Sequence, residues 1–329
     1  AALPAVSLVL ADRARPLVIP EPGSEEARIQ GVEWGIADIG ADRVWTEFGL
    51  DGSGIVVGSI DTGVMYRHPA LDDQYRGNRG DGTFDHNYNW HDPTGLCGAP
   101  SAGPCDNNGH GTHTVGTMVG DDGVNHIGVA PGARWIAAKG CEFITCSDEA
   151  LLSSMQFMLA PTDLEGENPN PDLRPHVVNN SWGGGPIDER YRDAIRAWTA
   201  AGIFPVFAAG NDGPACGTVQ HPGLLPESYA VGNYTSDHTI YFQSGRGPAP
   251  APFEGIKPDI AAPGTSIRSA WNDGGYASQT GTSMAAPHVS GTVALLWSSG
   301  RLMGDVAATR KLLNETAVPV GDLACGGGP

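Results

Sequence analysis

Short apolar runs alternate with helix-forming segments along most of this chain of 329 residues. The runs have the length of buried strands and are rich in small and β-branched residues. In chain order they are Gly54–Ile60, Trp135–Ala138, His176–Asn179, Phe204–Ala209 and Tyr229–Val231. Strands that alternate with helices in this way form a mainly parallel sheet. We therefore expect an α/β fold, a doubly wound sheet with helices on both faces.

Local signals place several of the helices. Ser147 has the residue type of a helix N-cap, and Asp148 and Glu149 follow it in the first turn, where negative charge is favourable. The segment Tyr191–Trp198 repeats apolar side chains at helical spacing, so one face should pack on the sheet. The segment Met284–Trp297 is almost entirely small or apolar, and it is therefore expected to be a buried helix.

The first 30 residues differ from the rest of the chain. Ala5–Leu10 is short and apolar like a strand, and prolines then interrupt regular structure. These prolines are Pro16, Pro20 and Pro22. We expect residues 1–30 to be an N-terminal extension and linker, and residues 31–329 to form one large domain.

The charge balance excludes two classes of partner. Lysine and arginine number 19 against 37 aspartate and glutamate, which gives a formal net charge of −18 at pH 7. Nucleic acids and anionic membrane surfaces are bound by basic faces, so neither is an expected partner. No stretch of the sequence approaches the roughly 18 consecutive apolar residues of a membrane span.

Six cysteines bear on the cellular compartment: Cys97, Cys105, Cys141, Cys146, Cys216 and Cys325. The absence of any C-x-x-C pair argues against zinc and iron–sulfur ligation. The short spacings Cys97–Cys105 and Cys141–Cys146 fit local disulfides and would leave Cys216 with Cys325. About fifteen pairings are possible for six cysteines, and scattered buried thiols are the alternative. Disulfides would indicate an oxidising, extracellular compartment.

Three segments carry residues that suit one chemistry. Asp61 ends an apolar strand, His110 lies between glycines at the start of a small-residue helix, and Ser283 begins the buried helix. The carboxyl ends of parallel strands and the helices that follow them share one edge of a sheet, so one crevice can hold all three side chains. A neutral imidazole can take the proton of a serine hydroxyl and activate it as a nucleophile. A carboxylate on the other ring nitrogen fixes the tautomer and stabilises the imidazolium.

These segments resemble those of the subtilisin-like serine proteases in their sequence motifs and in their order along the chain. The motifs are SIDTG, HGTHTVGT and GTSMAAPHV, and the order Asp, His, Ser is that of the family. The resemblance covers about residues 32–318, and segments such as VEWG, RHPAL and NNSWGGG make the chain most similar to the bacillopeptidase F group. It implies a secreted serine endopeptidase in which Asp61 orients the base His110 and Ser283 is the nucleophile. It also implies that His113, the second histidine of HGTH, is not the base.

The resemblance extends to residues around the nucleophile. Asn211, in the segment AAGN, is expected to donate its side-chain amide to the oxyanion. Ser181–Gly183 matches the family segment whose backbone pairs with the substrate as an added strand, and residues near Cys141–Cys146 should supply the opposite edge. Trp182 is expected to narrow a subsite, and packing in the core or on the surface is the alternative. The substrate-binding residues implied are Ser181, Trp182, Gly183 and Gly210.

No cofactor is expected in the chemistry, whereas structural calcium is an expectation without an assigned site. Many family members bind calcium through an aspartate that follows a His-Pro dipeptide, and this chain has Ala70 there, after His68 and Pro69. Carboxylates that could bind calcium gather in the long loop region from Asp72 to Asn108, for which a solvated acidic loop is the alternative. They are Asp72, Asp73, Asp81, Asp85, Asp92 and Asp106.

The N-terminal extension also resembles part of a subtilase precursor. The segment AALPAVSLVLADR is similar to the end of a subtilisin-type prosegment, so we expect the remnant of a zymogen whose prosegment inhibits it, with a mature start near Gly31. A simple N-terminal arm is the alternative. The chain ends at CGGGP, before the closing segment of the family, which fits C-terminal processing or truncation. We expect a monomer whose partners are protein or peptide substrates.

Other functions fit the sequence less well. A catalytically silent protein-binding module on the same fold would be expected to have lost a member of the triad or Asn211, and all four residues are present. A serine-carboxyl peptidase would replace His110 with glutamate and Asn211 with aspartate. A lipase or esterase of the α/β-hydrolase kind would show G-x-S-x-G around its nucleophile, where this chain reads GTSMA.

Overall fold

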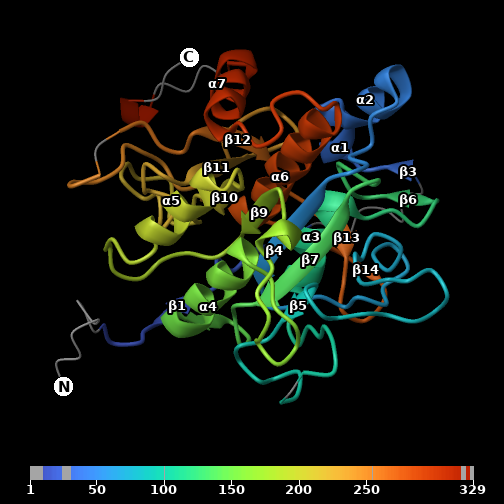
Figure 1. Cartoon of the computed structure of the whole chain (residues 1–329). Coiled ribbons are helices and arrows are strands. Elements are labelled where there is room, and N and C mark those ends of the chain that lie inside the picture. Colours follow the sequence, from blue (N-terminus) through green and yellow to red (C-terminus); the bar gives the residue numbers. More distant parts are fainter. Residues whose placement is uncertain (1–9, 24–30, 100, 254, 320–323, 327–329) are drawn as a thin grey trace.

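The structure of the chain is a computed structural model, and it describes residues 10–23, 31–99, 101–253, 255–319 and 324–326 (Figure 1). The strand predicted over Ala5–Leu10 lies outside these residues except for Leu10, which belongs to no strand. Within the described ranges, no helix has the length and apolar character needed to cross a membrane.

A seven-stranded sheet forms the centre of the molecule, in the order β12-β11-β10-β9-β4-β7-β5 (Figure 1). Every pair of neighbouring strands in it is parallel. The strands are β4 (Val56–Asp61), β5 (Trp90–His91), β7 (Arg134–Lys139), β9 (Val177–Asn180), β10 (Phe204–Ala208), β11 (Tyr229–Tyr234) and β12 (Ile260–Pro263). Strands are added on one side of β4 and then on the other, so the predicted doubly wound α/β fold is confirmed.

Helices cover both faces of this sheet because its side chains alternate between the faces. Val57 and Trp135 belong to a hydrophobic cluster that includes side chains of α3 and α6. Ile60 and Ile136 point the other way, into a second cluster with side chains of α4 and α5. The helices are α1 (Trp34–Asp38), α2 (Ala41–Phe48), α3 (His110–Val119), α4 (Asp148–Leu159), α5 (Arg192–Ala200), α6 (Thr282–Ser298) and α7 (Val306–Thr316), with short 3-10 turns at Pro171–Leu173 and Ala324–Gly326.

The local helix signals have the predicted effects. The hydroxyl of Ser147 accepts a hydrogen bond from the N–H of Ala150 at 3.2 Å, which caps α4. Helix α6 is buried along nearly its whole length and contains Pro287 in its interior. Its burial places the residues at its N-terminus firmly against the sheet.

Residues 10–23 lie on the body of the molecule and form short strands there, although their prolines were predicted to interrupt regular structure. Strand β1 (Ala14–Pro16) pairs antiparallel with β8 (Thr145–Ser147), beside the start of α4 (Figure 1). Strand β2 (Glu21–Pro22) pairs with β14 (Tyr276–Thr280). Pro16 and Pro22 are compatible with these strands because each strand forms an edge, where a missing N–H is tolerated. The remaining strands are β3 (Gly31–Val32), β6 (Asn125–His126) and β13 (Ile267–Ala270).

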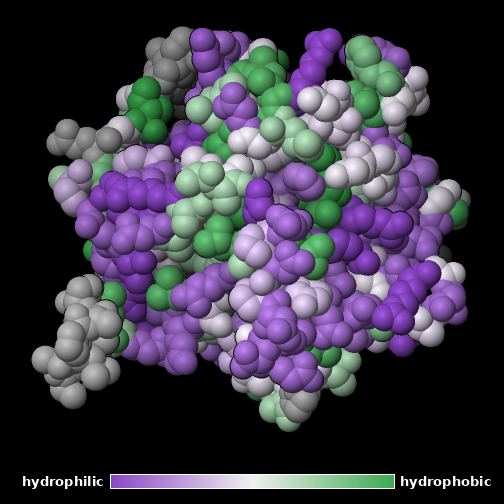
Figure 2. Space-filling model, viewed as in Figure 1, coloured by the Kyte–Doolittle hydropathy of each residue, from purple (hydrophilic) through white to green (hydrophobic). Residues whose placement is uncertain are grey.

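Three disulfides link Cys97 to Cys105, Cys141 to Cys146, and Cys216 to Cys325. This is the pairing that the short spacings favoured, and no cysteine of the described residues is free. The face of the molecule in Figure 2 is mostly hydrophilic, with hydrophobic residues scattered over it. The hydrophobic core is divided between the two faces of the central sheet.

Candidate active site

The residues predicted to carry chemistry meet at the carboxyl edge of the sheet. Asp61 is the last residue of β4, and Asn211 follows the end of β10. His110 is the first residue of α3, and Ser283 is the second residue of α6. Because the strands are parallel, their carboxyl ends and these helix N-termini face the same crevice.

His110 is held by Asp61 through a buried hydrogen bond. The ring Nδ1 lies 2.7 Å from Asp61 Oδ1, and each residue is 1% exposed. The backbone N–H of Thr62 donates to the same carboxylate oxygen at 2.7 Å. With Nδ1–H directed at a carboxylate, Nε2 is the ring nitrogen left to accept a proton. Within the described part of the chain, this buried Nε2 has no hydrogen-bond partner.

Asp106 joins the strand that carries Asp61 to the helix that carries His110. The hydroxyl of Thr62 donates to Asp106 Oδ1 at 3.0 Å, and the hydroxyl of Thr112 donates to Asp106 Oδ2 at 2.7 Å. The N–H of Gly109, which precedes α3, also donates to Asp106 Oδ1. Thr62 in turn accepts the N–H of Gly111 at 2.9 Å. The sequence suggested Asp106 only as a calcium ligand, and its hydrogen bonds show that it organises the start of α3.

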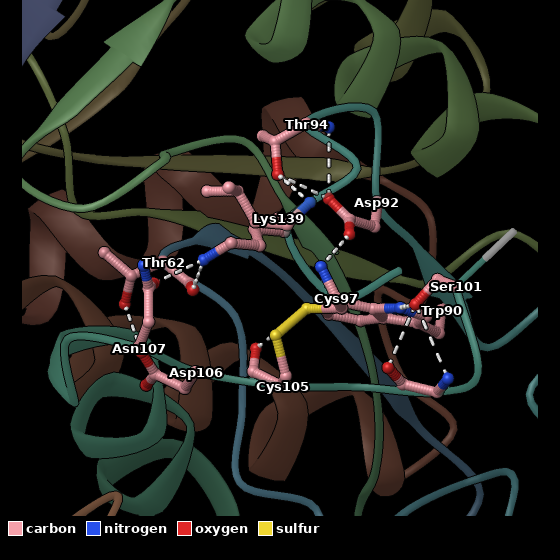
Figure 3. The surroundings of a disulfide bond; sticks show 12 residues. Thr62, Trp90, Asp92, Thr94, Cys97, Ser101, Cys105, Asp106, Asn107 and Lys139 are labelled. Carbon is pink, nitrogen blue, oxygen red and sulfur yellow. Dashed lines mark hydrogen bonds between the residues drawn. A yellow bond between two sulfur atoms is a disulfide. The ribbon is translucent and has the colours of Figure 1, made fainter. Parts of the chain in front are cut away.

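A buried lysine and a disulfide support the same corner (Figure 3). The ammonium group of Lys139 donates to the Thr62 carbonyl and to Asn107 Oδ1. Burial lowers the pKa of Lys139, although several nearby carboxylates act in the other direction. The Cys97–Cys105 disulfide comes directly before Asp106 in the chain. A Cβ at Gly63, whose φ is +107°, would lie 1.8 Å from the Cys105 carbonyl oxygen, so this close approach requires glycine.

Ser283 and Asn211 both contact the N-terminal segment. The hydroxyl of Ser283 donates to the carbonyl oxygen of Val18 at 2.9 Å, and it lies 3.3 Å from the carbonyl oxygen of Ser181. Asn211 Oδ1 accepts hydrogen bonds from the backbone and the hydroxyl of Thr282, both at 3.0 Å. Its amide nitrogen therefore faces away from α6, and it donates to the carbonyl of Ile19 at 3.2 Å.

The N-terminal segment crosses the crevice as an extended strand between two edges. On one side Arg15 pairs with Cys146, and the N–H of Leu17 donates to the Ile144 carbonyl at 2.9 Å. On the other side Leu17 forms an antiparallel bridge with Trp182. The edges near Cys141–Cys146 and at Ser181–Gly183, both predicted from the sequence, thus enclose a strand of this chain.

The remaining residues of the predicted substrate-binding set have different places. The hydroxyl of Ser181 donates to the Ser283 carbonyl at 3.0 Å, which fixes one edge to α6. The ring of Trp182 is fully buried against Tyr191 and Phe207, so the expectation that it narrows a subsite is corrected: the ring packs in the core beneath the cleft. The N–H of Gly210 donates to the Thr282 hydroxyl at 3.1 Å, which positions the neighbouring Asn211 rather than the strand in the cleft.

Two further histidines near the crevice are structural. His113 Nε2 lies 3.0 Å from the Ile267 carbonyl oxygen and 3.1 Å from that of Ala277, so it donates to both. Burial lowers the pKa of His113 to about 3. His288 Nδ1 donates to the Met284 carbonyl of its own helix at 2.8 Å, and burial lowers its pKa to about 4. Both rings are neutral donors in the core.

The acidic loop uses its carboxylates for its own turns. Asp92 accepts hydrogen bonds from the backbone of Thr94 and Cys97, and Asp81 accepts from Thr83. In the residues that the structure describes, no group of three histidine, cysteine, aspartate or glutamate side chains is arranged to hold a metal ion.

Comparison with known proteins agrees with this geometry. The profile of the subtilase family matches residues 52–328. The chain is 44% identical to Bacillopeptidase F of Bacillus subtilis (strain 168) over 89% of its length, but it spans only 20% of the length of that protein. It is 31% identical to an alkaline protease of Alkalihalobacillus alcalophilus, covering 91% of this chain and 70% of the relative. It is also 31% identical to Subtilisin Savinase of Lederbergia lenta, and the match covers 87% of this chain and 94% of that protein.

Proposed function

Because the chain belongs to the subtilase family, we propose that it is a secreted serine endopeptidase that hydrolyses peptide bonds through an acyl-enzyme on Ser283. The observation that carries this proposal is the extended strand in the crevice, whose Val18 carbonyl oxygen lies 2.9 Å from Ser283 Oγ. A peptide held between two edges beside a serine hydroxyl occupies the place where the substrate of an acyl transfer would bind.

In the proposed mechanism, Ser283 Oγ attacks the carbonyl carbon of the substrate while His110 Nε2 takes the hydroxyl proton. Asp61 keeps the ring in the required tautomer and stabilises the imidazolium. Asn211 Nδ2 and the N–H of Ser283 donate to the oxyanion. His110 then gives its proton to the leaving amine as the C–N bond breaks, and water hydrolyses the ester by the same route. In this mechanism the four side chains and the N–H of Ser283 carry the steps, and no cofactor is required.

Residues 10–23 are proposed to inhibit the enzyme until they are cleaved or displaced. Ser283 contacts the carbonyl of Val18, whereas Asn211 contacts the next carbonyl, that of Ile19. Attack requires the nucleophile and the oxyanion donor to act on one carbonyl, so the strand is held slightly out of register for reaction. Realignment that brings the Val18 carbonyl to both Ser283 and Asn211 would expose the Val18–Ile19 bond to cleavage, which lies upstream of the mature start expected near Gly31.

Secretion is supported by the three disulfides, which persist in oxidising compartments. No feature of the site favours the alternative of a silent binding module, because Asp61, His110 and Ser283 are all present at the crevice. Protein or peptide substrates and a monomeric state complete the proposal.

The test is the replacement Ser283→Ala, with Ser299→Ala as an exposed control serine. Loss of the nucleophile should lower kcat by about 10⁶, the magnitude known for subtilisin itself. After residues 10–23 have been cleaved or displaced, a fluorophosphonate should add to Ser283, as located by peptide mapping, and it should not add to the variant. Full peptidase activity in Ser283→Ala would refute the assignment, and Ser299→Ala should behave like the unmodified chain.

A further inference from the structure

The side chain of Arg15 lies in a closed polar pocket beside the crevice. Although arginine is almost never fully buried without a partner, Arg15 has no exposed surface. Its Nε lies 2.5 Å from Asp148 Oδ1, and one terminal nitrogen lies 3.3 Å from Asp188 Oδ2. The guanidinium is thus bound by one buried and one partly exposed carboxylate.

The other terminal nitrogen has neutral acceptors. It donates to the carbonyls of Gly184 at 2.9 Å and Pro186 at 3.3 Å. It also lies 3.1 Å from His221 Nδ1, which must accept because an arginine only donates. The guanidinium carbon lies 5.0 Å from the centre of the Tyr191 ring, within the range of a cation–π contact. All three guanidinium nitrogens therefore have partners.

The pocket is organised by contacts that do not depend on Arg15. Asp148 also accepts hydrogen bonds from the hydroxyl of Tyr191 and from Arg190, so its carboxylate keeps its place. Gly184 and Gly185 have φ values of +97° and +74°, which turn the backbone so that the Gly184 carbonyl faces the guanidinium. A Cβ at Gly185 would lie 3.4 Å from an Arg15 terminal nitrogen.

The register of the N-terminal strand defines which residue of a bound peptide places its side chain in this pocket. Val18, whose carbonyl contacts Ser283, is counted as the first residue on the amino side of the scissile bond. Leu17, Pro16 and Arg15 are then the second, third and fourth residues before that bond. Arg15 is fixed at this position by its pairing with Cys146 in β8. Any peptide that binds as an added strand in this register presents its fourth side chain to the same pocket.

We propose that this pocket, formed by Asp148, Asp188, Tyr191, His221 and the Gly184 and Pro186 carbonyls, selects substrates with arginine as the fourth residue before the scissile bond. The inference rests on the proposed peptidase function and names its substrate class. Acceptors around three separate nitrogens suit the planar fork of arginine better than the single ammonium of lysine. The N-terminal segment occupies the pocket through Arg15 in the way that a substrate would.

The experiment compares peptides that copy residues 15–21, with the scissile bond between Val18 and Ile19, and that differ only at the fourth residue before this bond, which is arginine, lysine or citrulline. Citrulline has the shape of arginine without its charge. The enzymes are the full chain and Arg15→Ala, whose N-terminal segment lacks the side chain that fills the pocket and should therefore be displaced more readily by a peptide. The arginine peptide should have a kcat/KM about 100-fold above the citrulline peptide, because Asp148 and Asp188 each lose one of their cationic partners. Lysine should lie between them.

A matched pair of variants localises the effect. Asp188→Asn removes a pocket carboxylate at its partly exposed rim and should lower the preference for arginine over citrulline about 10-fold. Asp193→Asn removes an exposed carboxylate from the nearby α5 and should leave the preference unchanged. Loss of the preference in both variants, or in neither, would contradict the assignment to Asp188.

Fluorophosphonate labelling of Ser283 separates this inference from the proposed function. Equal kcat/KM for arginine and citrulline peptides in a labelled enzyme would overturn the pocket's role and leave the peptidase assignment intact. A labelled enzyme that cleaves neither peptide would also overturn it. A folded enzyme that neither labels nor cleaves after residues 10–23 have been cleaved or displaced would overturn both proposals.

Discussion

His110 depends on two carboxylates, and each controls a different part of the residue. Asp61 binds the ring, whereas Asp106 binds the backbone and hydroxyl groups that surround the start of α3. The first contact sets the tautomer and the second sets the position of the helix that carries the ring. The rate of proton transfer is therefore expected to respond to changes at Asp106, which never contacts the imidazole.

The neutral buried histidines make the stability of the fold sensitive to acid. His113 and His288 have pKa values lowered by burial to about 3 and about 4. In the unfolded chain they take up protons below about pH 6.5, so stability is fully present above that pH and declines as pH falls toward 4. Between pH 6 and pH 5 we expect a loss of about 1 kcal/mol for each histidine. Urea unfolding of the Ser283→Ala protein, which cannot digest itself, measures this slope.

His113→Gln tests whether His113 carries its share of that slope. A glutamine amide can donate to the Ile267 and Ala277 carbonyls without being protonated. The variant should lose about 1 kcal/mol less than its parent over the same pH interval. An unchanged slope would mean that His113 becomes protonated within the fold.

The residues that sequence alone identified lie in contiguous motifs, and those that it missed do not. Asp61, His110 and Ser283 are each surrounded by a recognisable segment. Asp148 showed only the signature of a helix N-terminus, and nothing in the sequence connects it with His221 or Arg15. These three come together only through tertiary packing, because they belong to the N-terminal strand, α4 and the loop after β10.

At the level of elements, α7 offers a test of local stability that is separate from the site. Asp305 caps this helix by accepting the N–H of Ala308 at 2.9 Å. Asp305→Ala should lower the free energy of unfolding by about 1 kcal/mol, because the N–H loses its partner. Asp305→Asn keeps an acceptor and should restore most of the loss. Urea unfolding in the Ser283→Ala background measures both, and equal losses would show that capping is not the cause.

Strand–helix alternation predicted five of the seven strands of the central sheet, because these strands are buried on both faces and have continuous apolar runs. It missed β12, and it missed β5, which lies within the segment predicted to be a long loop. The ends of β4 and β7 differ from the predicted runs by only a few residues. The short strands β1 and β2 were missed because their pairing partners lie far away in sequence. A proline-rich segment of this kind becomes strand only when an edge elsewhere in the molecule accepts it.

At the level of the whole molecule, the three disulfides close loops of very different length. Cys216 and Cys325 are 109 residues apart, whereas Cys141 and Cys146 are 5 apart. Restriction of the unfolded chain gives about 5 kcal/mol of stabilisation for the long loop and about 2 kcal/mol for the short one. Replacing both Cys216 and Cys325 with serine should therefore destabilise the molecule more than replacing Cys141 and Cys146.

The short disulfide is the matched control because it lies in the substrate-binding edge rather than at the end of the chain. Its removal should loosen the strand that pairs with Arg15 and lower kcat/KM. It should lower the free energy of unfolding less than removal of the Cys216–Cys325 disulfide does. Urea unfolding of the two double variants in the Ser283→Ala background compares their stabilities, and peptide hydrolysis with Ser283 intact compares their activities. Equal stability losses would contradict the loop-length argument, because that argument attributes the whole difference between the two disulfides to the entropy of the unfolded chain. A larger loss from Cys141 and Cys146 would instead show that the native edge, and not the unfolded chain, determines the contribution of that disulfide.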